Sequence, residues 1–437
     1  MMEFSSFLWV CPFCGIVFSM SFFPLLFPNF WRKYACYVPL SWSLIYLVFV
    51  AYFFGLSQIV DAIFDPLLVD YLPFIILIAT LYIVSGGIFV DFPRGNGPIF
   101  NALFLLFGGF LAGWIGTTGA SMLLIRPFLR ANAGRKRCSH LVVFFIFLVA
   151  NIGGSATPIG DPPLFIGFLK GIDFFWFIRN LYPIIGSTIF ALVALFLIID
   201  FILFKGDPAT GRNGAAQSVF VLEGKVNLFL MAAVLFIVIS CNFSCEVSLW
   251  GHKFNYSSIL RNGLLVAIAL ISLRITPREI HKKNGFSAAP LREVAELFAG
   301  IFITIAPIIS ILQQGVNGAL GGVFRWIAPA GEFIANRCFW ASGLLSSLLD
   351  NAPTFLIFFH LTSGDAQTLM TVKSHILAAF SISTVFMGAL TYLGNAPNLM
   401  VRSIAEHHAV KTPSFMEYLL WSSVILLPIF AVISSCL

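Results

Sequence analysis

The sequence predicts an all-α polytopic membrane protein, organised as an inverted repeat with two re-entrant hairpins and two broken transmembrane helices. Hydrophobic residues make up 59% of the chain and charged residues 10%, whereas about a quarter of the residues in soluble domains are charged. Apolar runs of about 20 residues, the length that crosses a bilayer, recur along the chain. A polar Gly/Pro motif occurs twice within these runs. The net charge of +6 concentrates in short loops, which indicates membrane topology rather than nucleic-acid binding.

The apolar runs give the expected elements in order. Spans are predicted near residues 5–27, 36–54, 70–92, 139–176, 179–204, 226–246, 259–276, 292–313, 373–407 and 415–436. The runs 139–176 and 373–407 are too long for one plain helix and are interrupted by Gly and Pro, so we expect them to be the broken helices. Two further stretches, 96–130 and 320–362, carry the breakers "GTTG" and "DNAP" and are expected to be the hairpins.

The basic residues predict which side of the membrane each loop faces. Most of them fall on one side of this topology, which the positive-inside rule makes cytoplasmic. That side carries Arg32, Lys33, Arg94, Arg130, Arg135, Lys136, Arg137, Lys205, Arg212, Lys225, Arg274, Arg278, Lys282, Lys283, Arg402 and Lys411. The other side carries an acidic loop, Asp61–Asp70, and the exceptions Arg179, Lys253 and Lys373. The first apolar run lacks a preceding basic region, so it is expected to be a transmembrane helix rather than a signal peptide.

Four segments follow from this topology. We expect N-terminal transmembrane helices at 1–69, a first inverted repeat at 70–204, a cytoplasmic linker with connecting helices at 205–291, and a second inverted repeat at 292–437. The linker begins with the polar loop 205–225, which separates the two halves.

The repeat is visible in two short motifs. "TPIGDPP" (Thr157–Pro163) matches "TYLGNAP" (Thr391–Pro397) at an offset of 234 (391 − 157). The same offset places the first hairpin tip, "GTTGAS", on the second, "DNAPTF". The two hairpins enter from opposite sides in the predicted topology, which is the arrangement of an inverted repeat whose broken helices meet at the midplane. Gly/Pro motifs also recur by chance in a Gly-rich chain, but the matched distance from tip to break argues against chance.

The helix breaks and hairpin tips carry the candidate binding residues. Broken helices free backbone carbonyls and amides, which lipid cannot satisfy, and their ends can bind ions. The expected ion- or substrate-binding residues are Asp161, Asp350, Asn351, Thr117, Thr118, Ser155, Thr157, Thr391 and Asn395. The two carboxylates, Asp161 and Asp350, are the expected metal-binding groups, for Na⁺. Because burial favours the neutral form of a carboxyl group, either site could hold Na⁺ or H⁺.

Simpler roles are open for several of these residues. "GDPP" and "DNAP" are good helix starts, so Asp161 and Asp350 could serve only as N-caps. Arg126 and His360 occupy equivalent hairpin positions, where they either bind an anion or extend to the membrane interface. His140 and His375 begin the two broken helices and are either interfacial or part of a proton relay.

Three segments resemble a known superfamily. "NIGGSATPIGDPPLFIGFLKG", "LSSLLDNAPTFLIFF" and "MGALTYLGNAPNLMVRSIAE" resemble the ion transporter superfamily, in particular bacterial NhaD-like sodium/proton antiporters and citrate-transporter-like permeases. The resemblance covers residues 70–436. It implies a multi-pass inner-membrane protein, a homodimer, and no cofactor other than Na⁺ as transported or coupling ion. It also implies sodium ligands at 116–118 with 155–161, and at 350–352 with 391–395.

The function that we expect is secondary active transport, not an enzymatic reaction, with Na⁺ or Li⁺ exchanged for H⁺ at the midplane carboxylates. The alternative is a sodium-coupled citrate, dicarboxylate or oxyanion transporter of the same fold. The dicarboxylate branch carries Ser-Asn-Thr at both tips, whereas this chain has Gly-Thr-Thr and Asp-Asn-Ala. An acid at the second tip disfavours an anion, because like charges ~4 Å apart repel by about 4 kcal/mol at an effective dielectric constant near 20. An intramembrane aspartyl protease is disfavoured because its Gly-x-Gly-Asp motif would need glycine at Pro158.

The topology makes a direct prediction. Residues 131–138 should face the cytoplasm and residues 247–258 the outside, because the positive-inside rule fixes the orientation of the flanking helices. Single cysteines placed in each loop of a cysteine-free background should therefore react differently with a membrane-impermeant maleimide. Only the second loop should be labelled in intact cells. Labelling of both loops from one side would contradict the inverted repeat.

Overall fold

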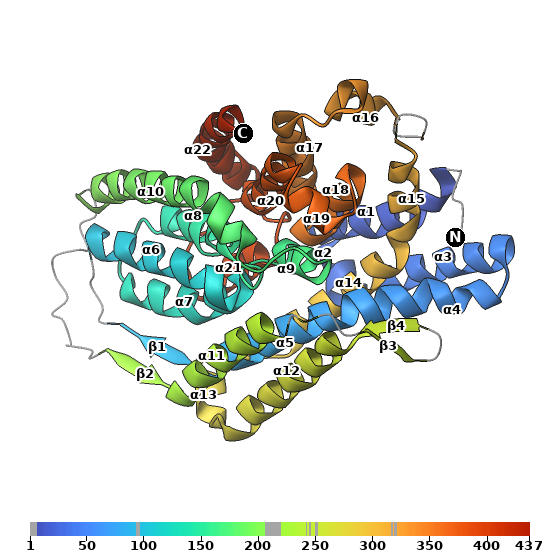
Figure 1. The fold of residues 1–437 in the computed structure, drawn as a ribbon. Helices are drawn as coiled ribbons and strands as arrows, with labels where there is room; N and C mark the ends of the chain where they lie inside the picture. The colour runs from blue at the N-terminus through green and yellow to red at the C-terminus, as the bar shows by residue number, and fades with distance from the viewer. Residues whose placement is uncertain are drawn as a thin grey trace.

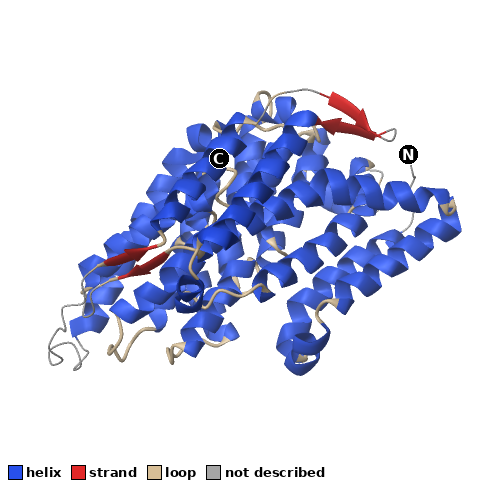
Figure 2. Ribbon diagram, turned by 90° about the horizontal axis from the view of Figure 1, so that it is seen from below, coloured by secondary structure: helices blue, strands red, loops and turns tan. Residues whose placement is uncertain are grey.

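Nearly all regular structure in the computed structural model is helical (Figures 1 and 2), which confirms the predicted all-α class. The structure describes residues 7–92, 97–205, 220–241, 243, 246–249, 252–315, 318 and 321–437; Arg94 and Arg212 of the charge pattern lie outside these ranges. Within them, seven helices are long and apolar enough to cross a membrane, or eight if one bent pair counts as a single span. The chain is therefore a multi-pass membrane protein.

The N-terminal third corrects one expectation. Its elements are η1 (Phe7–Val10), α1 (Cys11–Leu26), α2 (Pro28–Tyr34), α3 (Tyr37–Phe54), α4 (Ser57–Phe64), η2 (Asp65–Tyr71) and α5 (Leu72–Gly86). The predicted acidic loop Asp61–Asp70 is wrong, because these residues are helical, and η2 is a π-helical segment that joins α4 to α5. Asp70 is not a loop charge but accepts a hydrogen bond from Lys170 at 2.7 Å. The predicted domain boundary at residue 70 falls inside η2.

The first half continues with one hairpin, one broken helix and one long helix. These elements are α6 (Pro98–Ile115), α7 (Thr117–Ala131), α8 (Ser139–Leu148), η3 (Ile152–Ala156), α9 (Pro162–Leu169) and α10 (Trp176–Lys205). The hairpin turns at Gly116, and the broken helix is interrupted between α8 and α9. Both interruptions lie within the predicted Gly/Pro motifs.

The middle segment contains the strands, which the sequence analysis did not anticipate. After β1 (Phe89–Asp91), its elements are β2 (Val221–Glu223), α11 (Lys225–Ser240), β3 (Glu246–Leu249), β4 (His252–Asn255), α12 (Tyr256–Ile275) and α13 (Arg278–Lys283). β1 pairs antiparallel with β2, and β3 with β4. The two sheets lie at opposite ends of the helical body (Figure 2). The β1–β2 pair thus joins two connections that the charge pattern predicts on the same membrane side.

The second half follows the same order. Its elements are α14 (Ala289–Thr304), α15 (Ala306–Gln313), α16 (Gly321–Ile327), η5 (Pro329–Gly331), α17 (Ala335–Leu348), α18 (Asn351–Thr362), α19 (Ala366–Met370), α20 (Ser374–Met387), η6 (Gly388–Leu390), α21 (Ala396–His407) and α22 (Phe415–Cys436). The predicted span 292–313 is not straight, because α14 and α15 meet at a bend of 44°. Pro307 lies in the first turn of α15, where its missing N–H and its ring interrupt a continuous helix.

Helix starts recur at the offset of the sequence motifs. α7 begins at Thr117 and α18 at Asn351, and α9 begins at Pro162 and α21 at Ala396. Both pairs are 234 residues apart, the separation that also relates Asp161 to Asn395. The correspondence reaches α5 and α15, whose second residues, Pro73 and Pro307, have the same spacing.

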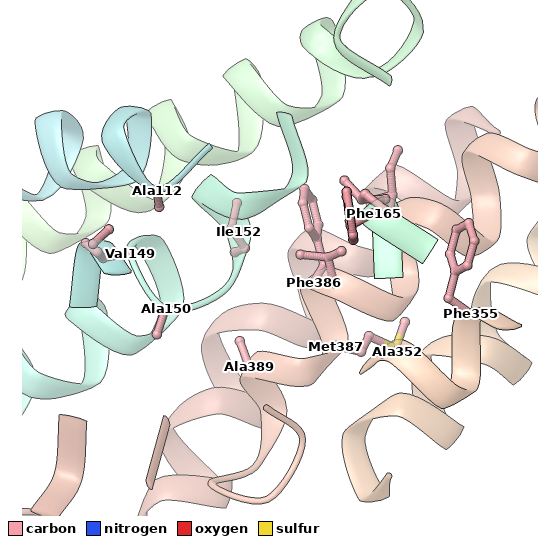
Figure 3. Close-up of a cluster of buried hydrophobic side chains, with 14 of the residues drawn as sticks. Ala112, Val149, Ala150, Ile152, Phe165, Ala352, Phe355, Phe386, Met387 and Ala389 are labelled. Carbon is pink, nitrogen blue, oxygen red and sulfur yellow. The ribbon is translucent and has the colours of Figure 1, made fainter. Parts of the chain in front are cut away.

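The two halves share one apolar core. Figure 1 shows α6 to α10 of the first half beside α17 to α22 of the second. α9 packs on α18 and η3 on α20, and Figure 3 shows Ile152 and Phe165 of the first half near Phe355 and Phe386 of the second. These side chains are at most 2% exposed. Within a bilayer such contacts hold helices together by close van der Waals packing rather than by exclusion of water, so this packing holds the two helix breaks together.

A buried ionic cluster fixes the first hairpin to its neighbours. Asp200 of α10 is fully buried and forms an ion pair with Arg135, and it also contacts His140 Nε2 at 2.9 Å. Asn101 of α6 donates to the same carboxylate at 2.9 Å. Because removal of one partner leaves a buried charge uncompensated, this cluster holds α6, α8 and α10 in one arrangement. His140 therefore belongs to this cluster, and its ring contacts Asp200 rather than a residue of the helix breaks.

Candidate functional site

The first hairpin tip is bonded to the broken helix of its own half. α6 ends at Ile115 and α7 begins at Thr117, with Gly116 between them at φ = 85°, a conformation that glycine adopts readily. The Thr117 N–H donates to the Gly160 carbonyl at 2.8 Å. This bond places the N-terminus of α7 directly against the residue that precedes Asp161.

Asp161 is the centre of the site. Its Oδ1 accepts hydrogen bonds from Thr117 Oγ1 at 2.8 Å and from Asn395 Nδ2 at 3.3 Å, and its Oδ2 accepts one from Asn351 Nδ2 at 2.8 Å. These donors come from both hairpin tips and from the second break. The side chain is 1% exposed. Although Asp161 precedes α9, its carboxylate makes no capping hydrogen bond to that helix, so simple capping does not account for it.

No ion pair joins Asp161 to a basic group within the described residues. Its partners are two amides and one hydroxyl, all of them neutral. A buried charge without a counter-charge is costly. The centre therefore favours either a bound cation or a proton.

Asp350 has a different role from Asp161. It is the N-cap of α18, and its Oδ1 accepts from the Ala352 N–H at 3.5 Å, so the capping alternative describes this residue. The neighbouring Asn351 carries the contact to Asp161. Ser346 donates to Asn351 Oδ1 at 2.8 Å, which orients the amide so that its Nδ2 reaches Asp161. Ser346 was not among the predicted site residues. The equivalent position in the first half is Ala112, so the repeat does not mark this position with a shared polar residue.

A chain of buried amides extends from the centre across the interface of the halves. Asn395 Nδ2 also lies 3.2 Å from Asn151 Oδ1, and Asn151 Nδ2 donates to Asn398 Oδ1 at 2.7 Å. Asn398 Nδ2 in turn donates to the carbonyls of Gly388 and Thr391, both at 2.9 Å. Satisfied polar networks in a low-dielectric interior favour a single arrangement of their members, so these amides fix the geometry around Asp161.

Three predicted binding residues use their hydroxyls elsewhere. Thr157 Oγ1 donates to the Gly113 carbonyl at 2.5 Å, and Thr391 Oγ1 donates to the Ser347 carbonyl at 2.6 Å. Both carbonyls lie in the last turn of a hairpin helix, where no intrahelical donor is available. Ser155 Oγ donates to the Ile152 carbonyl at 2.6 Å. The two threonines hold the breaks against the hairpins, whereas Ser155 bonds within its own break. Among the described residues, none of the three hydroxyls is hydrogen-bonded to Asp161.

Two cavities adjoin the centre. The smaller, about 30 Å³, is lined by Gly116, Thr117, Thr118, Gly160 and Asp161, among others. This volume exceeds the minimum for one water molecule. The larger, about 720 Å³, is lined by Thr118, Asp350 and Asn395 and extends to His407 and His408 at the end of α21. Both cavities are lined by Ile78, Tyr82, Thr118 and Pro162, so the two spaces are neighbours beside the first hairpin tip.

The equivalent residues Arg126 and His360 lie in different surroundings. Arg126 lines the larger cavity, whereas His360 lines neither cavity. His375, which begins the second broken helix, is exposed. The two hairpins are therefore similar in path but differ in the surroundings of their equivalent basic residues.

The donor set around the small cavity suits a hard monovalent cation. It consists of carboxylate, hydroxyl and backbone carbonyl oxygens, which are the ligands that hard cations prefer. Within the described residues, no group of three His, Cys, Asp or Glu side chains could hold a metal ion.

The architecture defines a class of protein. Broken helices that meet a pair of hairpins around a buried polar centre, beside a cavity, are characteristic of secondary transporters. A family model described as "Putative citrate transport" matches residues 2–437, and the chain belongs to this family. The predicted resemblance to citrate-transporter-like permeases is thereby confirmed. The description of the family points to a membrane transporter rather than to an enzyme.

One curated relative is similar to part of the chain. The "46 kDa membrane protein" of Mycobacterium leprae (strain TN) is 24% identical over 279 residues. The matched region covers 62% of this chain and 60% of that protein, so the chain spans less than two thirds of the relative's length.

The glycines at the breaks give a test of the geometry. A Cβ on Gly154 would collide with the Thr117 side chain, and a Cβ on Gly388 would collide with the Asn351 side chain. Gly154→Ala and Gly388→Ala should each displace one Asp161 donor and reduce transport in proteoliposomes by roughly tenfold or more, the equivalent of one lost charge-assisted hydrogen bond.

The matched control is Gly186→Ala in α10, where the added methyl group meets nothing within 4 Å and helix propensity improves. This variant should transport normally. Normal transport by both Gly154→Ala and Gly388→Ala would contradict the geometry described for the centre.

Proposed function

We propose that the chain is a sodium-coupled secondary transporter of citrate or a related carboxylate. The observation that carries this proposal is the pair of unequal cavities that share Thr118 in their walls. One has the size and ligands for a cation. The other has a volume within the range of roughly 300–1,000 Å³ that is usual for small-molecule sites, far more than a dehydrated monovalent ion needs.

The cation site that we propose lies in the small cavity. The Asp161 carboxylate, the Thr117 and Thr118 hydroxyls and the carbonyls of the first tip would hold Na⁺ there. Binding would balance the charge of Asp161, which has only neutral partners in the described structure.

The anion site that we propose lies in the large cavity. Three helices begin in its wall, since the lining includes Pro162 of α9, Pro353 of α18 and Ala396 of α21. Helix N-termini carry a partial positive charge and free N–H groups, which favour an anion. Asp350 opposes the anion, so a sodium ion bound nearby would raise the affinity for carboxylate. By linkage, the carboxylate would raise the affinity for sodium equally.

Exchange of Na⁺ or Li⁺ for H⁺ is the second candidate. The observation in its favour is Asp161 itself, because a buried carboxylate with neutral donors can release a cation only by taking up a proton or by remaining uncompensated. This mechanism needs no organic anion and makes no use of the larger cavity as a binding site. For both candidate functions, we propose that the protein is a homodimer in an inner membrane.

Asp161→Asn tests the cation role. The amide keeps the size of the carboxylate but removes its charge, so sodium should no longer bind. In proteoliposomes with an inward Na⁺ gradient, the wild type should take up labelled citrate in a sodium-dependent manner. In the variant, the rate of sodium-dependent citrate uptake should be lower by roughly tenfold or more.

The control is Asp365→Asn, which makes the same change at the exposed N-cap of α19, where the Asp365 side chain accepts from the Thr368 N–H at 2.7 Å. Asn caps nearly as well as Asp, so this variant should behave as the wild type. Sodium-dependent citrate uptake by Asp161→Asn would refute the cation role. A Na⁺-driven pH change with no citrate uptake in the wild type would favour the exchange mechanism instead.

A further inference from the structure

One face of α7 connects the site to the end of the larger cavity. Thr118, Met122 and Arg126 all line this cavity. They are spaced four residues apart, so they lie on the same helix face. At 1.5 Å per residue, the face extends about 12 Å from the hairpin tip. Arg126 therefore belongs to the cavity wall and not to the lipid-facing surface.

The Arg126 guanidinium lacks a partner. Its Nη1 is buried and has no hydrogen-bond acceptor. Glu293 also lines the cavity, but no ion pair joins it to Arg126 among the described residues. An arginine cannot lose its proton in a protein, and an unsatisfied buried donor is costly. The guanidinium is therefore a fixed positive charge that lacks an acceptor.

The surrounding chain leaves room for this group. Gly285 has φ = +55°, and a Cβ there would lie 2.9 Å from Arg126 Nη2. The Tyr82 hydroxyl, which also faces this region, is used in a 3.0 Å hydrogen bond to the Ser287 carbonyl. The guanidinium thus lies against the backbone at Gly285, and the Arg126 side chain forms part of the cavity wall.

The other basic groups at this end of the cavity do not replace Arg126. Burial and the positive charges of Arg126 and Arg130 lower the pKa of His408 from its ordinary value, so His408 is neutral at pH 7. The His407 ring lies 2.7 Å from the Ser403 carbonyl through Nδ1. Arg126 is accordingly the permanent cation facing the space that leads to Asp350.

We propose that Arg126 is an anion-binding residue that holds one carboxylate group of the transported substrate. This inference rests on the proposed function and adds the residue that determines its charge selectivity. A guanidinium binds a carboxylate through two parallel hydrogen bonds, and the positive charge offsets the repulsion from Asp350. The substrate is then a polycarboxylate, with one carboxylate at Arg126 and another at the helix N-termini near Asn395. The second half has no such group, because His360 lies outside the cavity.

Arg126→Gln tests this role, with Arg130→Gln as the matched control. Arg130 lies one turn further along α7, does not line the cavity, and is bound to Asp91 at 2.9 Å and to the Val90 carbonyl at 3.0 Å. At saturating Na⁺, Arg126→Gln should raise the KM for citrate by roughly tenfold or more. Arg126→Lys should give an intermediate value, because it keeps the charge but loses the paired geometry. Arg130→Gln should keep the wild-type KM for citrate. In Arg126→Gln, the Na⁺ concentration that gives half-maximal uptake should be the same as in the wild type.

The outcomes separate this inference from the proposed function. Citrate uptake with an unchanged KM in Arg126→Gln would overturn the inference and leave the function standing. Absence of citrate uptake in the wild type would reject the function. In that case the role of Arg126 is tested by the thermal stability of the detergent-solubilised protein, measured with and without citrate. Stabilisation by citrate in the wild type but not in Arg126→Gln supports it, and equal or absent stabilisation in both overturns it.

Discussion

The hydrogen bonds to the Asp161 carboxylate are the interaction on which the rest of the structure depends. They come from Thr117 on the first hairpin, Asn351 on the second hairpin and Asn395 at the second helix break. One buried carboxylate thus ties together four interruptions of helical structure that are far apart in the sequence. Because none of its partners is charged, any ligand that enters or leaves changes the electrostatic balance of all these elements at once. Coupling of one binding site to several structural elements is what an alternating-access transporter requires.

The scaffold is repeated, but the chemistry is not. Thr157 and Thr391 make the same hydrogen bond to the last turn of a hairpin helix. Gly154 and Gly388 permit the same close approach to a hairpin tip. In contrast, the acid in the first break corresponds to an amide, Asn395, in the second. The shared residues build the geometry, and the differing residues are the ones on which the proposed division into a cation site and an anion site rests.

The sequence was sufficient for the class and for the position of the breaks, since the breaks lie where Gly and Pro occur together with polar residues. Isolated prolines such as Pro183 and Pro428 remain inside helices. The sequence was not sufficient for three features. The helix through η2 reads as a loop because Asp65 and Asp70 look like solvent-exposed acids, whereas Asp70 is paired with Lys170. The bend at Pro307 lies within an otherwise continuous apolar run. The strands are only three or four residues long, too short to produce an alternating pattern.

The candidate site was predictable to a similar extent. The repeat offset selects the segments that meet, and the structure brings Asp161, Thr117, Asn351 and Asn395 together. The direction of a hydroxyl depends on which acceptors lie nearby, so Ser155, Thr157 and Thr391 could not be separated from Thr117 by sequence alone. Their acceptors are carbonyls left free in the broken helix and at the ends of the hairpin helices, which only the folded structure identifies.

The most direct test of the central claim is a high-resolution structure determined by electron cryomicroscopy with Na⁺ and citrate both present. The account predicts density for a cation between the Asp161 carboxylate and the first hairpin tip, and density for citrate in the larger cavity. The account would be contradicted if both ligands were absent or bound elsewhere, and if the contacts of Asp161 were the same with and without the ligands.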